Sequence, residues 1–259
     1  MKIFISADIE GVTTTTSWSD ENNALHTNQM TEEVLACVRG AKKAGATEIY
    51  VKDAHGNGVN IDPSRMPSGV CLLRNWSGHP YMMVEGVDKT FDAAMFVGYH
   101  SAATRAGNPM SHTVSGCQYI KINDELASEF MIYSYACAFE NVPTVFLSGD
   151  KMLCDEYKNF HPNLVTCAVK DGRGAMSVNY SPEDTLKNIE KQSESALSQK
   201  LDKALISLPK FFNVEICYKE HAQAEKVSYF PGVKKIDDTT VSYESSDYFE
   251  VLRALNWIL

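Results

Sequence analysis

The chain has 259 residues, of which 44% are hydrophobic and 22% charged, and it carries a formal net charge of −9. This composition is typical of a globular protein with one large α/β domain, alone or with a smaller companion. The negative charge argues against nucleic acid or an anionic membrane as partner, and no segment approaches the roughly 18 apolar residues of a membrane-spanning helix. The seven cysteines are scattered and form no C-x-x-C pair, so we expect free thiols and a cytoplasmic location.

The first half of the chain alternates between strand and helix patterns. Such alternation favours parallel strands joined by right-handed crossovers. The polar residues 13–28 are predicted to form a long loop beside any site at the end of the first strand. The predicted strands are 2–7, 48–51, 70–73, 93–97 and 114–122, and the predicted helices begin at Thr31 and at residue 126.

The second half continues this alternation and then departs from it. Strands at 143–147 and 164–169, a helix near 151–157 and a long helix that starts at Ser181-Pro182 extend the parallel pattern. After Pro209, the strands 211–218 and 239–243, a short helix at 222–227 and a terminal helix from 246 no longer follow it. We therefore expect a three-layer α/β domain over residues 1–208, with a mostly parallel sheet flanked by helices, and a smaller α+β subdomain over 209–259.

Three predicted strands end in carboxylate or imidazole side chains. The first is followed by Asp8 and Glu10, the second by Asp53 and His55, and the strongly apolar strand at 93–97 by His100. The carboxyl ends of parallel strands meet at one edge of the sheet, where α/β proteins place their sites, and neighbouring strands are about 4.8 Å apart. Histidine and carboxylate together suit zinc or another first-row divalent ion. The pattern therefore predicts a metal site, with one ion or two.

Simpler interpretations compete with this one. The acids could be solvated loop residues, and the histidines could be ordinary loop residues. Two further candidates are His112, at the start of the strand that follows His100, and Glu129, which lies beside bulky apolar residues on the next helix. The chain contains no G-x-S-x-G elbow, P-loop or G-x-G-x-x-G, which removes the usual signatures of acyl hydrolases, NTPases and dinucleotide-binding proteins.

Several short motifs occur in the same order as in a known family. With further matches at 222–225, 231–232 and 239–241, they span nearly the whole chain. The motifs are Ser6-Ala7-Asp8-Ile9-Glu10-Gly11, Asp53-Ala54-His55, Met83-Val84-Glu85-Gly86-Val87-Asp88, Gly98-Tyr99-His100, Met110-Ser111-His112, and Ile122-Asn123-Asp124 followed by Glu129. The chain thus resembles the D-aminopeptidases of the DppA type, peptidase family M55.

This resemblance implies a site with two Zn²⁺ ions per subunit. Asp8 matches the bridging carboxylate of the family and His112 its catalytic histidine. The remaining ligands match Glu10, His55, His100 and Glu129. The resemblance further implies release of N-terminal D-amino acids from short peptides such as D-Ala-D-Ala, and assembly of the subunits into a homo-oligomer, a decamer of two stacked pentamer rings. Ala54, Gly56 and the segment 13–28 depart from the family pattern, which bears on substrate preference more than on metal binding.

The expected mechanism follows from charge. Three carboxylates against two zinc ions leave one positive charge, which a bound hydroxide would balance, so a metal-bound hydroxide is the expected attacking group. We expect His112 to act as a proton shuttle or oxyanion stabiliser, and a nucleophilic role stays open. Two alternatives are a metal-dependent amidase or dipeptidase that acts on non-D substrates and an inactive homologue that binds or scaffolds. The presence of every ligand-type residue argues against the inactive homologue.

Overall fold

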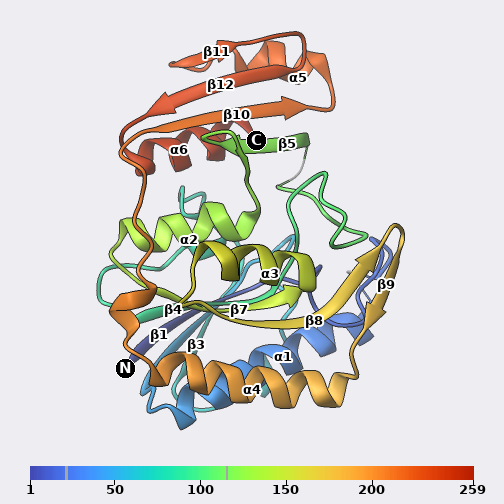
Figure 1. Ribbon diagram of the computed structural model, residues 1–259, viewed down its shortest axis with the longest axis vertical. Helices are drawn as coiled ribbons and strands as arrows, with labels where there is room; N and C mark the ends of the chain where they lie inside the picture. Colours follow the sequence, from blue (N-terminus) through green and yellow to red (C-terminus); the bar gives the residue numbers. More distant parts are fainter. Residues whose placement is uncertain (21–22, 115) are drawn as a thin grey trace.

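The computed structural model describes residues 1–20, 23–114 and 116–259, which form a large and a small sheet (Figure 1). The large sheet has the strand order β3-β2-β1-β4-β7-β8-β9 and is parallel except for β9 at its edge. The central strands β1, β4 and β7 are almost entirely buried, as their apolar sequences predict. The strands are β1 Lys2–Ala7, β2 Glu48–Asp53, β3 Val70–Leu73, β4 Ala93–Tyr99, β7 Thr144–Asp150, β8 Val165–Arg173 and β9 Met176–Asn179.

Helices cover both faces of this sheet. On one face α1 (Ala24–Lys43) packs against α4 (Pro182–Ser198), and α2 (Glu129–Phe139) and α3 (Lys151–Phe160) cover the other (Figure 1). At Gly40 the helices α1 and α4 are so close that a Cβ would lie 2.0 Å from Ser193 Oγ. The buried apolar side chains accordingly form one cluster on each face of the sheet. The predicted three-layer α/β fold is confirmed.

The small sheet is antiparallel and has the order β11-β12-β10-β5-β6. Its strands β5 (Cys117–Ile122) and β6 (Glu125–Leu126) come from the middle of the chain, and β10 (Phe212–Tyr218), β11 (Val233–Lys235) and β12 (Thr240–Ser245) from its end. It carries α5 (His221–Val227) and α6 (Tyr248–Ile258), and the Tyr248 hydroxyl joins α6 to α2 by donating to Ile132 O at 2.8 Å. Short 3-10 helices occupy Pro63–Arg65, Met82–Val84 and Leu201–Ala204.

Several element boundaries differ from the prediction because of local capping. Helix α1 begins at Ala24 and not at Thr31, since the Asn23 side chain caps it by accepting a hydrogen bond from Leu25 N. The predicted loop 13–28 is therefore shorter, and its residues 21 and 22 lie outside the described residues. Helix α2 begins at Glu129 rather than at residue 126, because Ser128 Oγ accepts from Met131 N.

Several strands also differ from the sequence prediction. The strand predicted over 114–122 begins only at Cys117, and residue 115 within it is not among the described residues. The short strands β6, β9 and β11 were not predicted. Strand β9 pairs with β8 as a hairpin that turns at Gly174, where φ is 61°.

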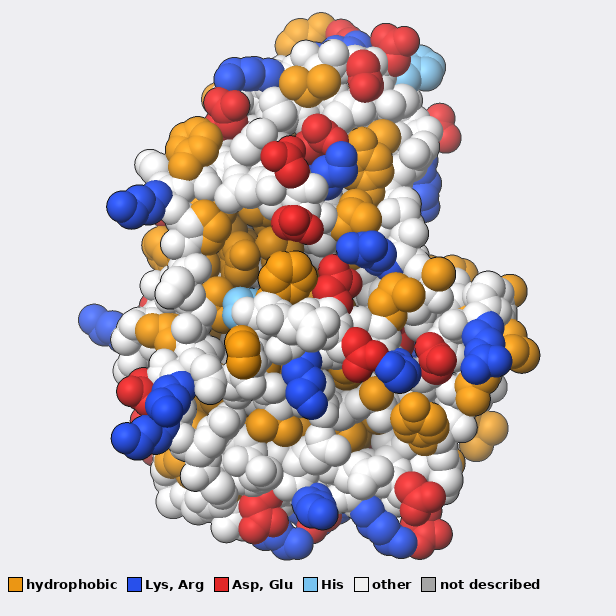
Figure 2. Space-filling view, in the orientation of Figure 1, with side chains coloured by type: hydrophobic (Ala, Val, Ile, Leu, Met, Phe, Trp, Pro, Cys, Tyr) orange, Lys and Arg blue, Asp and Glu red, His pale blue; other side chains and the backbone are white. Residues whose placement is uncertain are grey.

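The surface is mixed in charge. Among the described residues on the face shown in Figure 2, basic side chains are scattered among acidic ones. Within the described ranges, no helix combines the length and the apolar character that crossing a bilayer requires.

Candidate metal centre

The sheet brings the three predicted strand ends together. Strand β1 lies between β2 and β4 and is parallel to both, with Ala7 paired to Asp53 on one side and to Val97 on the other. The residues that follow these strands therefore meet at one edge, at the carboxyl ends of the central strands. Asp53 is the exception: its carboxylate accepts hydrogen bonds from the backbone N–H groups of Asn60 and Ile61, so it braces the loop after β2.

Two glycines allow the turn after β1 to pass over the end of β4. Asp8 N donates to Val97 O at 2.9 Å, and Gly11 N donates to Gly98 O at 2.8 Å. A Cβ at Gly98, where φ is +73°, would lie 2.2 Å from Asp8 O, and one at Gly11 would lie 1.8 Å from Tyr99 O. Only glycine fits this crossing, which holds the Asp8–Glu10 turn beside His100.

Asp8 occupies the centre of the site, with a histidine on each side. His55 Nδ1 lies 3.3 Å from Asp8 Oδ1 and 3.2 Å from Glu10 Oε2. On the opposite side, His100 Nε2 lies 3.5 Å from Asp8 Oδ2 and 3.2 Å from Glu129 Oε2. All of these side chains are buried.

Glu129 and His112 reach the site from outside the parallel strands. Glu129 begins α2, where the first turn of a helix favours a carboxylate, and its Oε1 accepts from Val114 N at 2.7 Å. His112 Nε2 lies 3.5 Å from Glu129 Oε1 and 3.9 Å from Glu10 Oε1. The His112 ring stacks on His100, with centroids 4.4 Å apart. Thus the structure brings all six predicted site residues together.

These donors fit divalent ions. Two sets of ligand atoms, each within a 4.8 Å span, share one carboxylate: Asp8 with Glu10 and His55, and Asp8 with His100 and Glu129. Asp8 Oδ2 is buried and accepts no hydrogen bond from the described residues. His100 Nδ1 donates to Ser101 O at 3.0 Å, which fixes the ring with Nε2 toward the carboxylates, where it can hold a proton or, once that proton has left, bind an ion. A buried acceptor with no donor and an imidazole oriented in this way are features of a metal site.

The electrostatics of the cluster favour cations. Burial and the neighbouring charge of Glu10 raise the pKa of Asp8 well above its usual range. Burial opposes charge on His55 and His100 as well, yet the surrounding carboxylates raise the pKa of His55 to about 11 and that of His100 to about 10. Three buried carboxylates therefore create a strongly negative potential, which protons or metal ions can neutralise.

Two buried charges that the sequence prediction missed brace the site from behind. Lys170, on β8, donates to the backbone carbonyls of Glu10 and Thr15, and burial lowers its pKa to about 8. Asp150, at the end of β7, accepts from Ser101 N and Ser101 Oγ, both at 2.6 Å, and so fixes the turn that carries His100. Asp150 follows the same strand-end pattern as Asp8, His55 and His100 and could have been singled out. Lys170 lies within a strand and carries no such signal.

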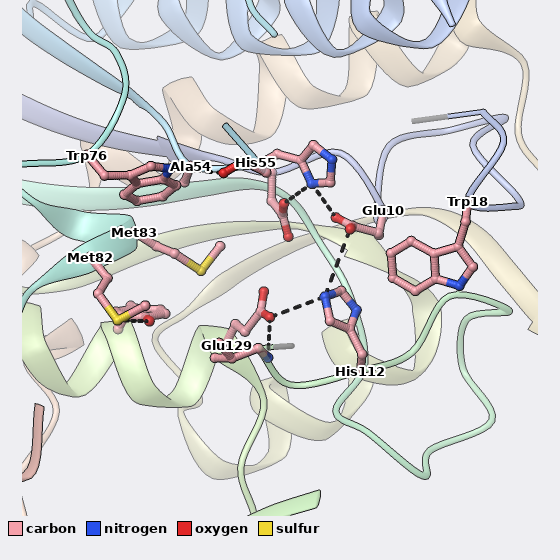
Figure 3. Close-up of a pocket in the computed structure, with 13 residues that line it drawn as sticks. Glu10, Trp18, Ala54, His55, Trp76, Met82, Met83, His112 and Glu129 are labelled. Atoms are coloured by element: carbon pink, nitrogen blue, oxygen red, sulfur yellow. Dashed lines mark hydrogen bonds and ion pairs between the residues drawn. The ribbon is translucent and has the colours of Figure 1, made fainter. Parts of the chain in front are cut away.

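The cluster opens into a cavity of about 400 Å³. Asp8, Glu10, His55, His112 and Glu129 form its polar floor. Figure 3 shows Glu10, His55, His112 and Glu129 between two hydrophobic borders. Trp18 lies beside His112 on one side, and Trp76, Met82 and Met83 lie on the other. A pocket of this size with converging polar groups is typical of small-molecule sites.

Comparison with known proteins assigns the chain to a family. The family model described as Peptidase M55, D-aminopeptidase, matches residues 1–257. The chain belongs to the peptidase M55 family. This M55 protein is therefore a peptidase and a hydrolase, and the family predicted from its motifs is confirmed.

One relative and one solved structure match this M55 protein over nearly its whole length. A D-aminopeptidase of Bacillus subtilis strain 168 is 29% identical over 263 residues, which cover 98% of this chain and 95% of the relative. A solved structure is described as the zinc-dependent D-aminopeptidase DppA from Bacillus subtilis, a self-compartmentalizing protease. The two structures match with a TM-score of 0.92 at 28% sequence identity, and the match covers 100% of this chain and 96% of the DppA chain.

Proposed function

We propose that this protein is a zinc-dependent aminopeptidase that releases N-terminal D-amino acids from short peptides of the D-Ala-D-Ala kind. The observation that carries the proposal is the pair of buried ligand groups that share Asp8 at the floor of the largely apolar cavity. Membership of a D-aminopeptidase family and the zinc dependence of the Bacillus subtilis relative support it.

We assign two Zn²⁺ ions to each subunit. Asp8 would help to hold both ions, since each of its oxygens faces a different histidine. Glu10 and His55 complete one ligand group, and His100 and Glu129 complete the other. Zinc bound there would act as a Lewis acid that polarises a peptide carbonyl and lowers the pKa of a water molecule.

His112 is the residue that we assign to proton transfer. Its Nδ1–H donates to Met110 O at 2.9 Å, so the Nε2 lone pair faces the site and can take up a proton. Its side chain is 26% exposed, unlike that of His100, which is fully buried, and therefore borders the space open to substrate. From this position His112 can hand the proton to the leaving nitrogen of the peptide or donate to the developing oxyanion.

We also propose that the subunits assemble into a homo-oligomer, in the form of a decamer of two pentamer rings, in the cytoplasm. The description of the Bacillus subtilis relative as self-compartmentalizing supports assembly. Exposed hydrophobic side chains on and beside β9, those of Met176, Val178 and Tyr180, offer a surface for assembly. Light scattering of the protein as it elutes from a size-exclusion column measures its molar mass in solution. The mass of ten chains is expected, and the mass of a single chain would contradict the decamer.

The cytoplasmic location is supported by the cysteines. All seven are free thiols, which suits a reducing compartment.

The experiment that tests the activity combines elemental analysis with a substrate comparison. The purified protein is expected to contain two zinc ions per chain and to hydrolyse D-Ala-D-Ala and D-alanine amides faster than their L counterparts. Faster turnover of the L substrates would favour an amidase or dipeptidase of different stereochemistry. Absence of both metal and hydrolysis would instead point to an inactive binding protein.

A further inference from the structure

One side of the cavity is an apolar wall built from Trp76, Met82, Met83 and Tyr133. Trp76 is held in place beside the metal centre. Its indole N–H donates to Gly56 O at 2.9 Å, one residue after His55, and the Lys52 ammonium lies 4.0 Å from the centroid of its ring. The ring is therefore an ordered surface at the His55 end of the site.

The other end of the apolar wall is attached to α2. Tyr133 lies one helical turn after Glu129, so both side chains project from the same face of α2. The Tyr133 hydroxyl donates to Met82 Sδ at 3.4 Å. Met83 is anchored through its carbonyl, which accepts from Ser6 Oγ at 2.6 Å. The apolar wall thus extends from the His55 ligand group to the Glu129 ligand group. Its two thioethers can adapt to side chains of different shape.

The position of His112 orients the substrate relative to this wall. His112 and Trp18 pack edge to face, with ring centroids 5.0 Å apart, on the opposite side of the cavity (Figure 3). If His112 protonates the leaving nitrogen, the part of the peptide that departs as an amine lies on the His112 side. The residue on the other side of the scissile bond, which is the N-terminal one in an aminopeptidase, then faces the apolar wall.

The chemistry of the apolar wall restricts the side chains that it can bind. Its one hydroxyl, that of Tyr133, already donates to Met82, so a polar side chain would lose water there without gaining a good partner. The ionisable residues at the cavity floor are the carboxylates and histidines of the metal centre, and none of the described lining residues is Lys or Arg. The described lining therefore offers an acidic side chain on the substrate no lysine or arginine to bind.

From these observations we infer that the apolar wall is the specificity site for the N-terminal residue, and that the preferred substrates begin with a large apolar D-residue such as D-Leu or D-Met. This inference rests on the proposed aminopeptidase function and names its substrate class. Burial of added methylene groups in an apolar pocket discriminates by about tenfold or more. D-Leucine amides should therefore exceed D-alanine amides in kcat/KM by at least about tenfold.

The test compares D-leucine and D-alanine p-nitroanilides on the zinc-loaded protein and two variants. Met82→Gln keeps the size of the side chain and gives the Tyr133 hydroxyl an oxygen to bind, so the fold should tolerate it. It should reduce the D-Leu to D-Ala ratio of kcat/KM by about fivefold or more, chiefly through KM, because a polar group now faces the apolar substrate. Met152→Gln, at an exposed position on α3 away from this cavity, is the matched control and should leave the ratio unchanged.

A calorimetric titration with D-leucinol and D-alaninol gives a second readout that requires no turnover. D-Leucinol should bind the wild-type protein more tightly, and Met82→Gln should remove most of that difference. Hydrolysis of D-alanine substrates with no preference for D-Leu in either assay would overturn the inference and leave the proposed function intact. Absence of all hydrolysis would overturn the proposed function. In that case the titration alone would test whether the apolar wall binds large apolar side chains. Equal binding of D-leucinol and D-alaninol would refute this role, and tighter binding of D-leucinol would support it.

Discussion

Glu33 provides the most quantitative prediction from this structure. It lies on α1 and is fully buried, and its Oε1 accepts from Thr13 N at 3.0 Å and from Gln29 Nε2 at 3.2 Å. Its Oε2 accepts no hydrogen bond from the described residues. Burial raises the pKa of this carboxyl from 4.5 to about 7, even though these hydrogen bonds and the charge of Lys170 act in the opposite direction.

The raised pKa makes the stability of the protein fall as the pH rises. Below about pH 4.5 the carboxyl is protonated in both states and its full contribution to stability is present. Between about pH 4.5 and 7 the unfolded chain releases this proton and the folded protein retains it, so the free energy of unfolding decreases. A difference of about 2.5 pH units, at about 1.4 kcal/mol each, amounts to roughly 3–4 kcal/mol.

Urea denaturation of Glu33→Gln and wild-type protein between about pH 5 and 8 measures this contribution. The variant cannot ionise, so its free energy of unfolding should rise relative to wild type as the pH increases and level off above about pH 7. The new amide N–H₂ replaces an oxygen without a partner, which adds an offset of about 1–3 kcal/mol that does not depend on pH. Glu32→Gln, at the adjacent and partly exposed position, is the control. Parallel stability curves for wild type and Glu33→Gln would refute the reasoning.

Three further predictions concern the metal centre and its support. Asp8→Ala should lose both metal ions, because both ligand groups use this carboxylate, and full zinc content by elemental analysis would contradict the bridge. His112→Ala should retain its zinc and lose most of its turnover, so a near-normal kcat would exclude the proton-transfer role. Gly98→Ala should lower the free energy of unfolding by about 3 kcal/mol or more in chemical denaturation, since its Cβ would lie 2.2 Å from Asp8 O. At Gly174 φ is similarly positive, but a Cβ there would have no neighbouring atom within 4 Å. If Gly98→Ala and Gly174→Ala lower the free energy of unfolding equally, backbone strain alone is responsible.

The meeting of Asp8, His55 and His100 at one edge of the sheet was predictable because it depends on strand order, which local sequence patterns reveal. Asp8, His55 and His100 each follow an apolar strand, and parallel neighbours must end at the same edge. Glu129 and His112 were less certain from pattern alone. Glu129 comes from a helix and His112 from a loop, and their direction toward the site depends on how those segments pack. The ordered family motifs supplied what the spacing could not.

The sequence by itself determined the alternation of strands and helices, the carboxylate and imidazole chemistry at the strand ends, and the family. Each of these depends on short sequence segments or on the order in which such segments follow one another along the chain. Only the tertiary structure decided that Asp8 faces two histidines, that Lys170 braces the backbone of Glu10 from a strand 160 residues away, and that Trp76 and Tyr133 share one apolar wall. These contacts join residues distant in sequence, and packing of the whole chain brings them within reach.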